Sequence, residues 1–128
     1  MSEILHKELS YVLTGLFFKI HKELGRFCRE KQYSDRFEKL LIENHFNYKR
    51  EFEINKLQSN SPDGNRVDFL IDDKLIIDFK AKNFITKEDY YQMQRYLCGA
   101  NLELGMIVNF RQPHLKPKRV LNSSEVHS

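Results

Sequence analysis

Apolar side chains recur at three- and four-residue steps in three stretches of the chain, which is the spacing of one face of an α-helix. The first stretch predicts a helix over residues 3–24, followed by Gly25, a residue that suits a helix C-terminal cap. The second predicts a helix over residues 29–45, and in the third Thr86 caps a helix with Asp89 in an approximate capping box. The predicted buried faces consist of Leu5, Leu9, Val12, Leu16, Ile20 and Leu24, then Tyr33, Phe37, Leu40 and Leu41, then Met93, Tyr96 and Leu97.

Between the second and third predicted helices, the pattern changes to the period of two that is typical of β-strands. Residues 48–57 predict a half-buried strand, residues 59–64 a turn, and residues 66–71 and 75–80 a hairpin. A nearly continuous apolar run over residues 104–110 predicts a strand buried on both faces, although its periodicity also permits a short helix. The predicted order is helix, helix, three strands, helix, strand, which indicates an α/β domain.

The predicted hairpin carries two carboxylates and an amine. Side chains alternate between the faces of a sheet, so Asp78 and Lys80 share a face. If residues 72–74 form a three-residue loop, the register that follows places Asp68 directly opposite Asp78. Like charges in such positions repel each other unless a cation lies between them. The hairpin therefore predicts a site for a divalent metal, Mg²⁺ or Mn²⁺, with Lys80 beside it.

The alternative for these three residues is a solvated sheet face, because 30% of the chain is charged. The residues around them are too apolar for an exposed edge, and a buried strand rarely carries an unpaired charge. The flanking sequence thus favours the metal site.

Length and composition restrict the number of domains and the cellular compartment only moderately. The 128 residues fit one domain, which we expect over residues 1–121, with a flexible tail over residues 122–128. Cys28 and Cys98 lack the spacing of a zinc site or a disulfide framework, which is typical of a reducing cytoplasm. No apolar run approaches the roughly 20 residues of a membrane-spanning helix, so we expect a soluble, cytoplasmic protein.

The net charge of +3 permits a polyanionic partner without requiring one. Near the C-terminus, four basic residues occur with no acid between them: Arg111, Lys116, Lys118 and Arg119. This run could contact nucleic-acid phosphates, or it could be a solvated basic edge.

The element order, with Asp68 on one hairpin strand and Asp78-x-Lys80 on the next, resembles the PD-(D/E)XK nuclease superfamily. Within it the chain is similar to the small bacterial GxxExxY proteins. The matching segments run in order from about residue 9 to residue 121 and include residues 20–25, Glu30, Tyr33, Val67-Asp68, residues 77–81, Gln92, Tyr96-Leu97 and residues 105–110. The resemblance implies a restriction-endonuclease-like αβββαβ core with an additional N-terminal helix.

The resemblance also implies roles for individual residues. Asp68, Asp78 and Glu30 are implied metal ligands, Lys80 the phosphate-facing amine, and Gln92 a supporting polar group. From the residues alone, Glu30 could equally be a first-turn acid favoured by the helix dipole, and Gln92 a helix-surface amide. Two departures from the family pattern are Arg26-Phe27, where Pro-Gly is usual, and Asp78, where Glu is more frequent.

We therefore expect a Mg²⁺- or Mn²⁺-dependent nuclease that hydrolyses phosphodiester bonds, with DNA as the substrate, in a bacterial cytoplasm. Two alternatives stay open: a catalytically inactive nucleic-acid-binding module, and a protein-interaction subunit that retains the nuclease fold. A homodimer is expected only by analogy with enzymes that cut two strands.

Overall fold

The computed structural model describes residues 6–54 and 65–123. In these residues the chain forms three helices and five strands in the order α-α-β-β-β-α-β-β. The elements are α1 (Lys7–Leu24), α2 (Glu30–Glu43), β1 (Tyr48–Glu53), β2 (Arg66–Ile71), β3 (Leu75–Lys80), α3 (Lys87–Ala100), β4 (Leu104–Asn109) and β5 (Lys118–Leu121). None of these helices is long and apolar enough to cross a membrane.

The strands form one sheet in the order β1-β2-β3-β4-β5. β3 and β4 are parallel and are connected through α3, whereas the other neighbouring pairs are antiparallel. Two parallel strands end at the same edge of a sheet, so the carboxyl ends of β3 and β4 lie side by side. Ile71 pairs with Leu75, which confirms the predicted three-residue loop over residues 72–74.

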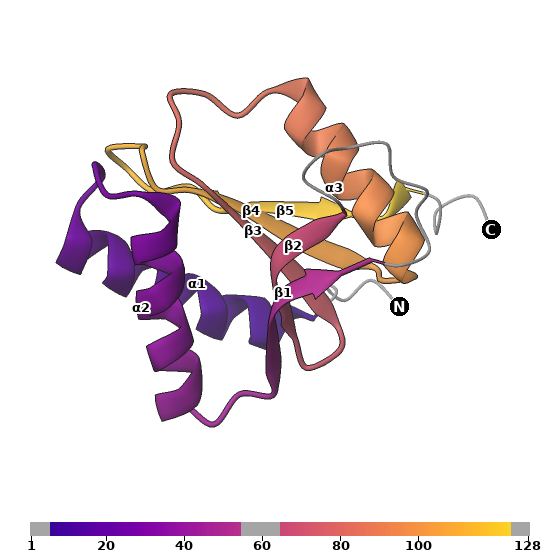
Figure 1. The fold of residues 1–128 in the computed structure, drawn as a ribbon, viewed down its shortest axis with the longest axis horizontal. Coiled ribbons are helices and arrows are strands. Elements are labelled where there is room, and N and C mark those ends of the chain that lie inside the picture. The colour runs from indigo at the N-terminus through magenta and orange to yellow at the C-terminus, as the bar shows by residue number, and fades with distance from the viewer. Residues whose placement is uncertain (1–5, 55–64, 124–128) are drawn as a thin grey trace.

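Helices cover both faces of the sheet: α1 and α2 pack on one face, and α3 packs on the other (Figure 1). The alternation of side chains along the strands divides the core accordingly. The core beneath α1 and α2 is rich in aromatic rings, with Phe17, Phe37, Phe69, Phe79 and Phe110 fully or almost fully buried. The core beneath α3 is mainly aliphatic and includes Ile76, Met93, Leu97 and Ile107. The predicted α/β, restriction-endonuclease-like fold is confirmed.

The helix ends follow their sequence signals. Gly25 ends α1 with φ 78°, a left-handed value that glycine adopts without strain, and its N–H donates to the His21 carbonyl at 2.9 Å. Thr86 and Asp89 form the predicted capping box at the start of α3. The helix predicted over residues 29–45 spans Glu30 to Glu43. Residues 3–5 of the first predicted helix and residues 55–57 of the first predicted strand lie outside the described residues, as do residues 59–64.

The C-terminal region differs from the prediction. β5 was not predicted, because its four residues alternate too briefly to show a period, and pairing with β4 is what makes them a strand. Asn122, assigned from the sequence to the start of a flexible tail, is only 3% exposed and donates through its amide side chain to the Leu102 carbonyl at 2.9 Å. Ser123 donates from its backbone to the Gln94 side chain. These two residues thus belong to the packed fold, and residues 124–128 lie outside the described part.

Candidate active site

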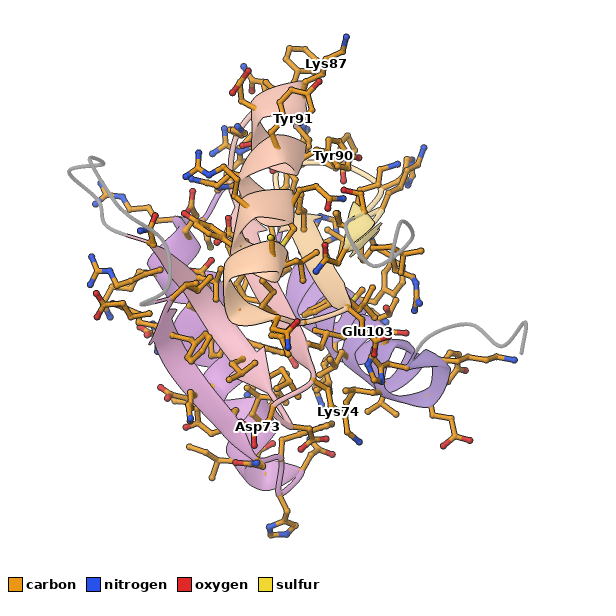
Figure 2. The ribbon with its side chains drawn as sticks, turned by 90° about the vertical axis from the view of Figure 1, so that its right-hand side faces the viewer. Asp73, Lys74, Lys87, Tyr90, Tyr91 and Glu103 are labelled. Carbon is orange, nitrogen blue, oxygen red and sulfur yellow. The ribbon has the colours of Figure 1, made fainter. Side chains whose placement is uncertain are left out.

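The predicted site lies at the carboxyl ends of β3 and β4. β3 starts next to the β2–β3 turn and ends at Lys80, so the turn and the site lie at opposite ends of that strand. Figure 2 shows the turn residues Asp73 and Lys74 far from Lys87, the first residue of α3. The acidic turn residues are consequently separate from the acids of the site.

The pairing of β2 with both of its neighbouring strands is interrupted at Asp68. The ladder between β1 and β2 skips Asp68 and the residue opposite it, Glu51, and the ladder between β2 and β3 ends one residue short of it, at Phe69. In place of a strand partner, the Phe79 N–H donates to Asp68 Oδ2 at 2.6 Å. Continuing the β2–β3 register by one residue places Asp68 opposite Asp78. The sequence-based register is therefore confirmed from Ile71 to Phe69, and its continuation reaches the two predicted metal ligands.

Negative charge accumulates around Asp68. Burial, the charge of Asp78 and a hydrogen bond with Asp78 raise the pKa of Asp68 to about 8, while the Phe79 N–H acts in the opposite direction. Glu30 adds to the repulsion. The pKa of Glu30 is itself raised, mainly by partial burial, with Lys80 lowering it and Asp78 raising it. Glu30, at the start of α2, thus shares the electrostatic environment of the hairpin.

Lys80 forms an ion pair with Asp78. Its Nζ lies 2.8 Å from Asp78 Oδ2, and both side chains are largely buried, with 19% and 14% of their surfaces exposed. Burial alone would lower the pKa of Lys80, but Asp78, Asp89 and Glu30 outweigh it, so the pKa is raised. Lys80 is therefore a cation at neutral pH.

Two further residues, Lys82 and Asp89, extend this network in a way that sequence reasoning missed. Lys82 Nζ lies 2.6 Å from Asp89 Oδ2, and Lys80 Nζ lies 3.9 Å from Asp89 Oδ1. The same Asp89 carboxylate accepts the Thr86 N–H at 2.7 Å, which ties the network to the start of α3. Asp89 was interpreted only as a cap, and Lys82, two residues after Lys80, continues the alternation that placed Asp78 and Lys80 together.

Tyr33 holds the loop that precedes Glu30. Its hydroxyl donates to the Gly25 carbonyl at 2.6 Å and accepts the Cys28 N–H at 3.2 Å. Its ring stacks on Phe110 with centroids 4.1 Å apart and an interplanar angle of 8°. The tyrosine of the family pattern is thus a structural residue that fixes the entry to α2, and with it the backbone of Glu30.

Arg26 and Phe27, which depart from the family pattern, form a basic and aromatic surface with Arg111. Arg26 Nε donates to the Arg111 carbonyl at 2.7 Å, and Arg111 Nε donates to the Arg26 carbonyl at 2.9 Å. The two guanidinium carbons lie 4.8 and 5.5 Å from the ring centroid of Phe27, whose side chain is 74% exposed. We call these three residues the Arg-Phe-Arg surface. It adjoins the loop that leads to Glu30.

The other three residues predicted to contact nucleic acid lie on different faces of the sheet. Lys116 and Lys118 line a pocket of about 270 Å³ on the α3 face. Arg119 lies on the α1 face, where its guanidinium donates to the Ser10 hydroxyl. Gln92 is half-buried on α3, one turn after Asp89, and within the described part of the chain no hydrogen bond joins its side chain to Asp68, Asp78 or Lys80. The structure thus brings Lys116 and Lys118 together but places Arg119 elsewhere.

Asp68 lines a pocket of about 220 Å³ together with Glu51 of β1 and with Arg66 and Val67 of β2. Among the described residues, no three His, Cys, Asp or Glu side chains already form a metal-binding cluster. The chemistry of the donor set nevertheless fits Mg²⁺ or Mn²⁺, because such ions bind through one or two carboxylates and complete their coordination with water and phosphate. Asp68 and Asp78 supply that pair.

The sequence profile of the PD-(D/E)XK nuclease superfamily matches residues 7–120, so the chain belongs to this superfamily. No curated protein and no solved structure is significantly similar to the chain. Nucleases of the superfamily generally use divalent metal ions and act on nucleic acids. The superfamily identified from the motifs is confirmed, and the resemblance to the small bacterial GxxExxY proteins stays a prediction.

Proposed function

We propose that the protein is a metal-dependent nuclease that hydrolyses phosphodiester bonds in DNA. The observation that carries the proposal is the convergence of Asp68, Asp78 and Lys80, two facing carboxylates with a cationic amine 2.8 Å from one of them. Membership of the nuclease superfamily supports the same conclusion.

Asp68 and Asp78 hold the metal in this proposal, and Glu30 is the third predicted ligand. The raised pKa of Asp68 supports this role, because burial and the neighbouring charge of Asp78 both disfavour an ionised Asp68, and a bound cation would offset both effects. A divalent ion bound here would stabilise charge on the phosphoryl oxygens and lower the pKa of a bound water.

Lys80 acts as an electrostatic group in this proposal. Its raised pKa means that it keeps its proton, which excludes it as a general base at neutral pH and suits it to neutralise charge on the phosphate. Asp89 limits how far Lys80 and Lys82 move, because its carboxylate lies within ion-pair distance of both amines. Gln92, on the same helix as Asp89, would orient the lysine or the attacking water.

The surfaces around the site favour a polyanionic substrate. The Arg-Phe-Arg surface presents two guanidinium groups. Each donates a hydrogen bond from Nε to a backbone carbonyl, which fixes its orientation and leaves its terminal nitrogens to contact a phosphate. An exposed ring such as Phe27 can stack on a base. Lys116 and Lys118 would add phosphate contacts on the other side of β4, and a contact from Arg119 stays a prediction.

Cleavage assays test this function. Supercoiled, linear and single-stranded DNA, and RNA, are incubated with Mg²⁺, Mn²⁺ or EDTA and with wild type, Asp78→Ala or Lys80→Ala. We expect cleavage of DNA that requires metal and is lost in both variants. Binding of nucleic acid without cleavage would favour an inactive binding module, and failure to bind any nucleic acid would favour a protein-interaction subunit.

A further inference from the structure

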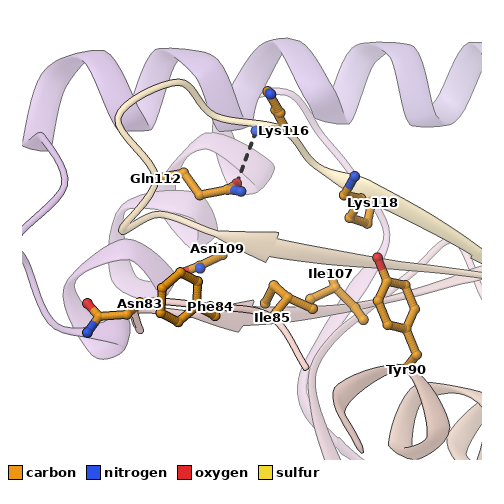
Figure 3. Close-up of a pocket in the computed structure, with 9 residues that line it drawn as sticks. All are labelled: Asn83, Phe84, Ile85, Tyr90, Ile107, Asn109, Gln112, Lys116 and Lys118. Carbon is orange, nitrogen blue, oxygen red and sulfur yellow. Dashed lines mark hydrogen bonds between the residues drawn. The ribbon is translucent and has the colours of Figure 1, made fainter. Parts of the chain in front are cut away.

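The pocket on the α3 face has the composition of a nucleotide-binding site. Nine residues line it: Asn83, Phe84, Ile85, Tyr90, Ile107, Asn109, Gln112, Lys116 and Lys118 (Figure 3). We call it the flanking pocket. Its lining combines two lysines, two aromatic rings and three side-chain amides, and no acidic residue is among the nine.

The flanking pocket lies next to the active site in the register of the sheet. Asp78 on β3 pairs with Ile107 on β4, which in turn pairs with Lys118 on β5. Lys80 pairs with Asn109 in the same way. Adjacent strands lie about 4.8 Å apart, so the backbone of Lys118 is roughly 10 Å from that of Asp78. A nucleotide next to the scissile phosphate can span such a separation.

The two aromatic rings of the flanking pocket lie on either side of two isoleucines (Figure 3). In Figure 3 the Tyr90 hydroxyl points toward Lys118, while Ile85 and Ile107 lie between Tyr90 and Phe84. Phe84 is 77% exposed, so its ring is available to a ligand. Lys116 donates its backbone N–H to Gln112 Oε1 at 3.3 Å, a contact that ties the loop carrying this lysine to the pocket. The side-chain amine of Lys116 takes no part in that bond.

From these observations we propose that the flanking pocket holds one unpaired nucleotide of the substrate, with its base against Phe84 and Tyr90 and its phosphate near Lys116 and Lys118. This inference rests on the proposed nuclease function and specifies its substrate class. A concave site of about 270 Å³ accepts a base only after that base has left the duplex stack. The preferred substrate is therefore single-stranded DNA or a frayed DNA end.

Fluorescence anisotropy in EDTA, where metal-dependent cleavage is prevented, tests the flanking pocket. The probes are a labelled single-stranded oligothymidylate and a labelled blunt duplex. The proteins are wild type, Lys118→Gln, Phe84→Ala and the matched control Lys87→Gln, an exposed lysine of α3 that does not line the pocket. We expect wild type and control to prefer the single strand, and the two pocket variants to bind it about tenfold more weakly.

Several results would overturn this inference. Equal affinity for single strand and duplex would do so, as would pocket variants that bind like wild type. Displacement of the probe by inorganic phosphate as readily as by thymidine monophosphate would reduce the pocket to a simple anion site. Metal-dependent cleavage together with unaltered binding by the pocket variants would refute the pocket alone. Pocket-dependent binding without any cleavage would instead refute the proposed nuclease activity.

Discussion

Asp68 faces Asp78 across the β2–β3 pair, just beyond the last pair of hydrogen-bonded residues. Here the Phe79 N–H donates to the Asp68 side chain, at Oδ2, and not to the backbone of β2. Burial of Asp68, together with the charge of Asp78 and a hydrogen bond with it, raises the pKa of Asp68 to about 8 from an ordinary 3.8. In the metal-free protein, the folded state thus binds a proton more tightly than the unfolded state does. Ionisation of Asp68 consequently destabilises the folded state as the pH rises from about 4 to about 8.

The first prediction concerns Asp68→Asn. Without metal, the variant should be more stable than wild type, and its advantage should grow from pH about 4 to about 8, because asparagine does not ionise. With saturating Mg²⁺ the order should reverse, since a ligand that binds the folded state stabilises it and the variant lacks one carboxylate. Thermal unfolding in EDTA and in Mg²⁺ measures both effects, with Glu53→Gln as a control on an exposed strand residue. A pH-independent difference between Asp68→Asn and wild type in EDTA would contradict the electrostatic account.

The second prediction concerns Glu51, which lies opposite Asp68 with φ 55°. This left-handed value is unfavourable for a residue with a Cβ, by roughly 1–2 kcal/mol. Glu51→Gly should therefore be neutral or stabilising, whereas Glu53→Gly in the regular part of the same strand should be destabilising by about 0.5–1 kcal/mol. Urea unfolding compares the two variants. Equal destabilisation by both glycines would mean that the distortion of β1 beside Asp68 carries no strain.

The third prediction concerns Tyr33. Replacing it by Phe removes the partner of the Gly25 carbonyl and of the Cys28 N–H, so Tyr33→Phe should lower the free energy of unfolding by about 1–2 kcal/mol. Tyr11→Phe is the matched control, because Tyr11 is 80% exposed. Denaturant titrations measure both changes. If the two substitutions had the same effect, Tyr33 would not be what fixes the α1–α2 loop.

The fourth prediction concerns the Arg-Phe-Arg surface. Phe27→Ala should weaken binding of single-stranded DNA by about fivefold or more, because an exposed ring close to two guanidinium groups can stack on a base whose phosphates they contact. Phe18→Ala serves as the control, since Phe18 is also exposed but lies on α1 outside this surface. Anisotropy in EDTA provides the comparison. Equal affinities of the two variants would remove Phe27 from the nucleic-acid contacts.

The sequence predicted the parts of this protein that depend on local pattern. The hairpin register followed from the alternation of apolar residues and a three-residue loop, and it brought Asp68 to Asp78 without knowledge of the tertiary structure. The capping box at Thr86 and the cap at Gly25 have equally local causes. The family pattern then supplied Glu30, which no short-range period could have connected to the hairpin.

Contacts between distant segments could not be predicted in this way. The reciprocal bonds of Arg26 and Arg111 join residues 85 positions apart, and no spacing rule relates them. Asp89 caps α3 and also forms an ion pair with Lys82. An aspartate suits either role, so the capping pattern in the sequence gave no sign of the ion pair. Arg119 belonged to a basic run in the sequence, yet alternation along β5 places it on the face opposite Lys118. In each case tertiary packing decides which face or partner a side chain meets.

The rate of DNA cleavage by Asp78→Ala, measured beside that of Asp73→Ala, tests whether the site formed by Asp68, Asp78 and Lys80 is a metal-dependent nuclease centre. Asp73 is an exposed acid in the β2–β3 turn, at the opposite end of β3 from the site. With Mg²⁺ or Mn²⁺, we expect Asp73→Ala to cleave like wild type, and Asp78→Ala to lose at least about 100-fold in rate. Cleavage that survives in Asp78→Ala, or that persists in EDTA, would show that this site is not a metal-dependent nuclease centre.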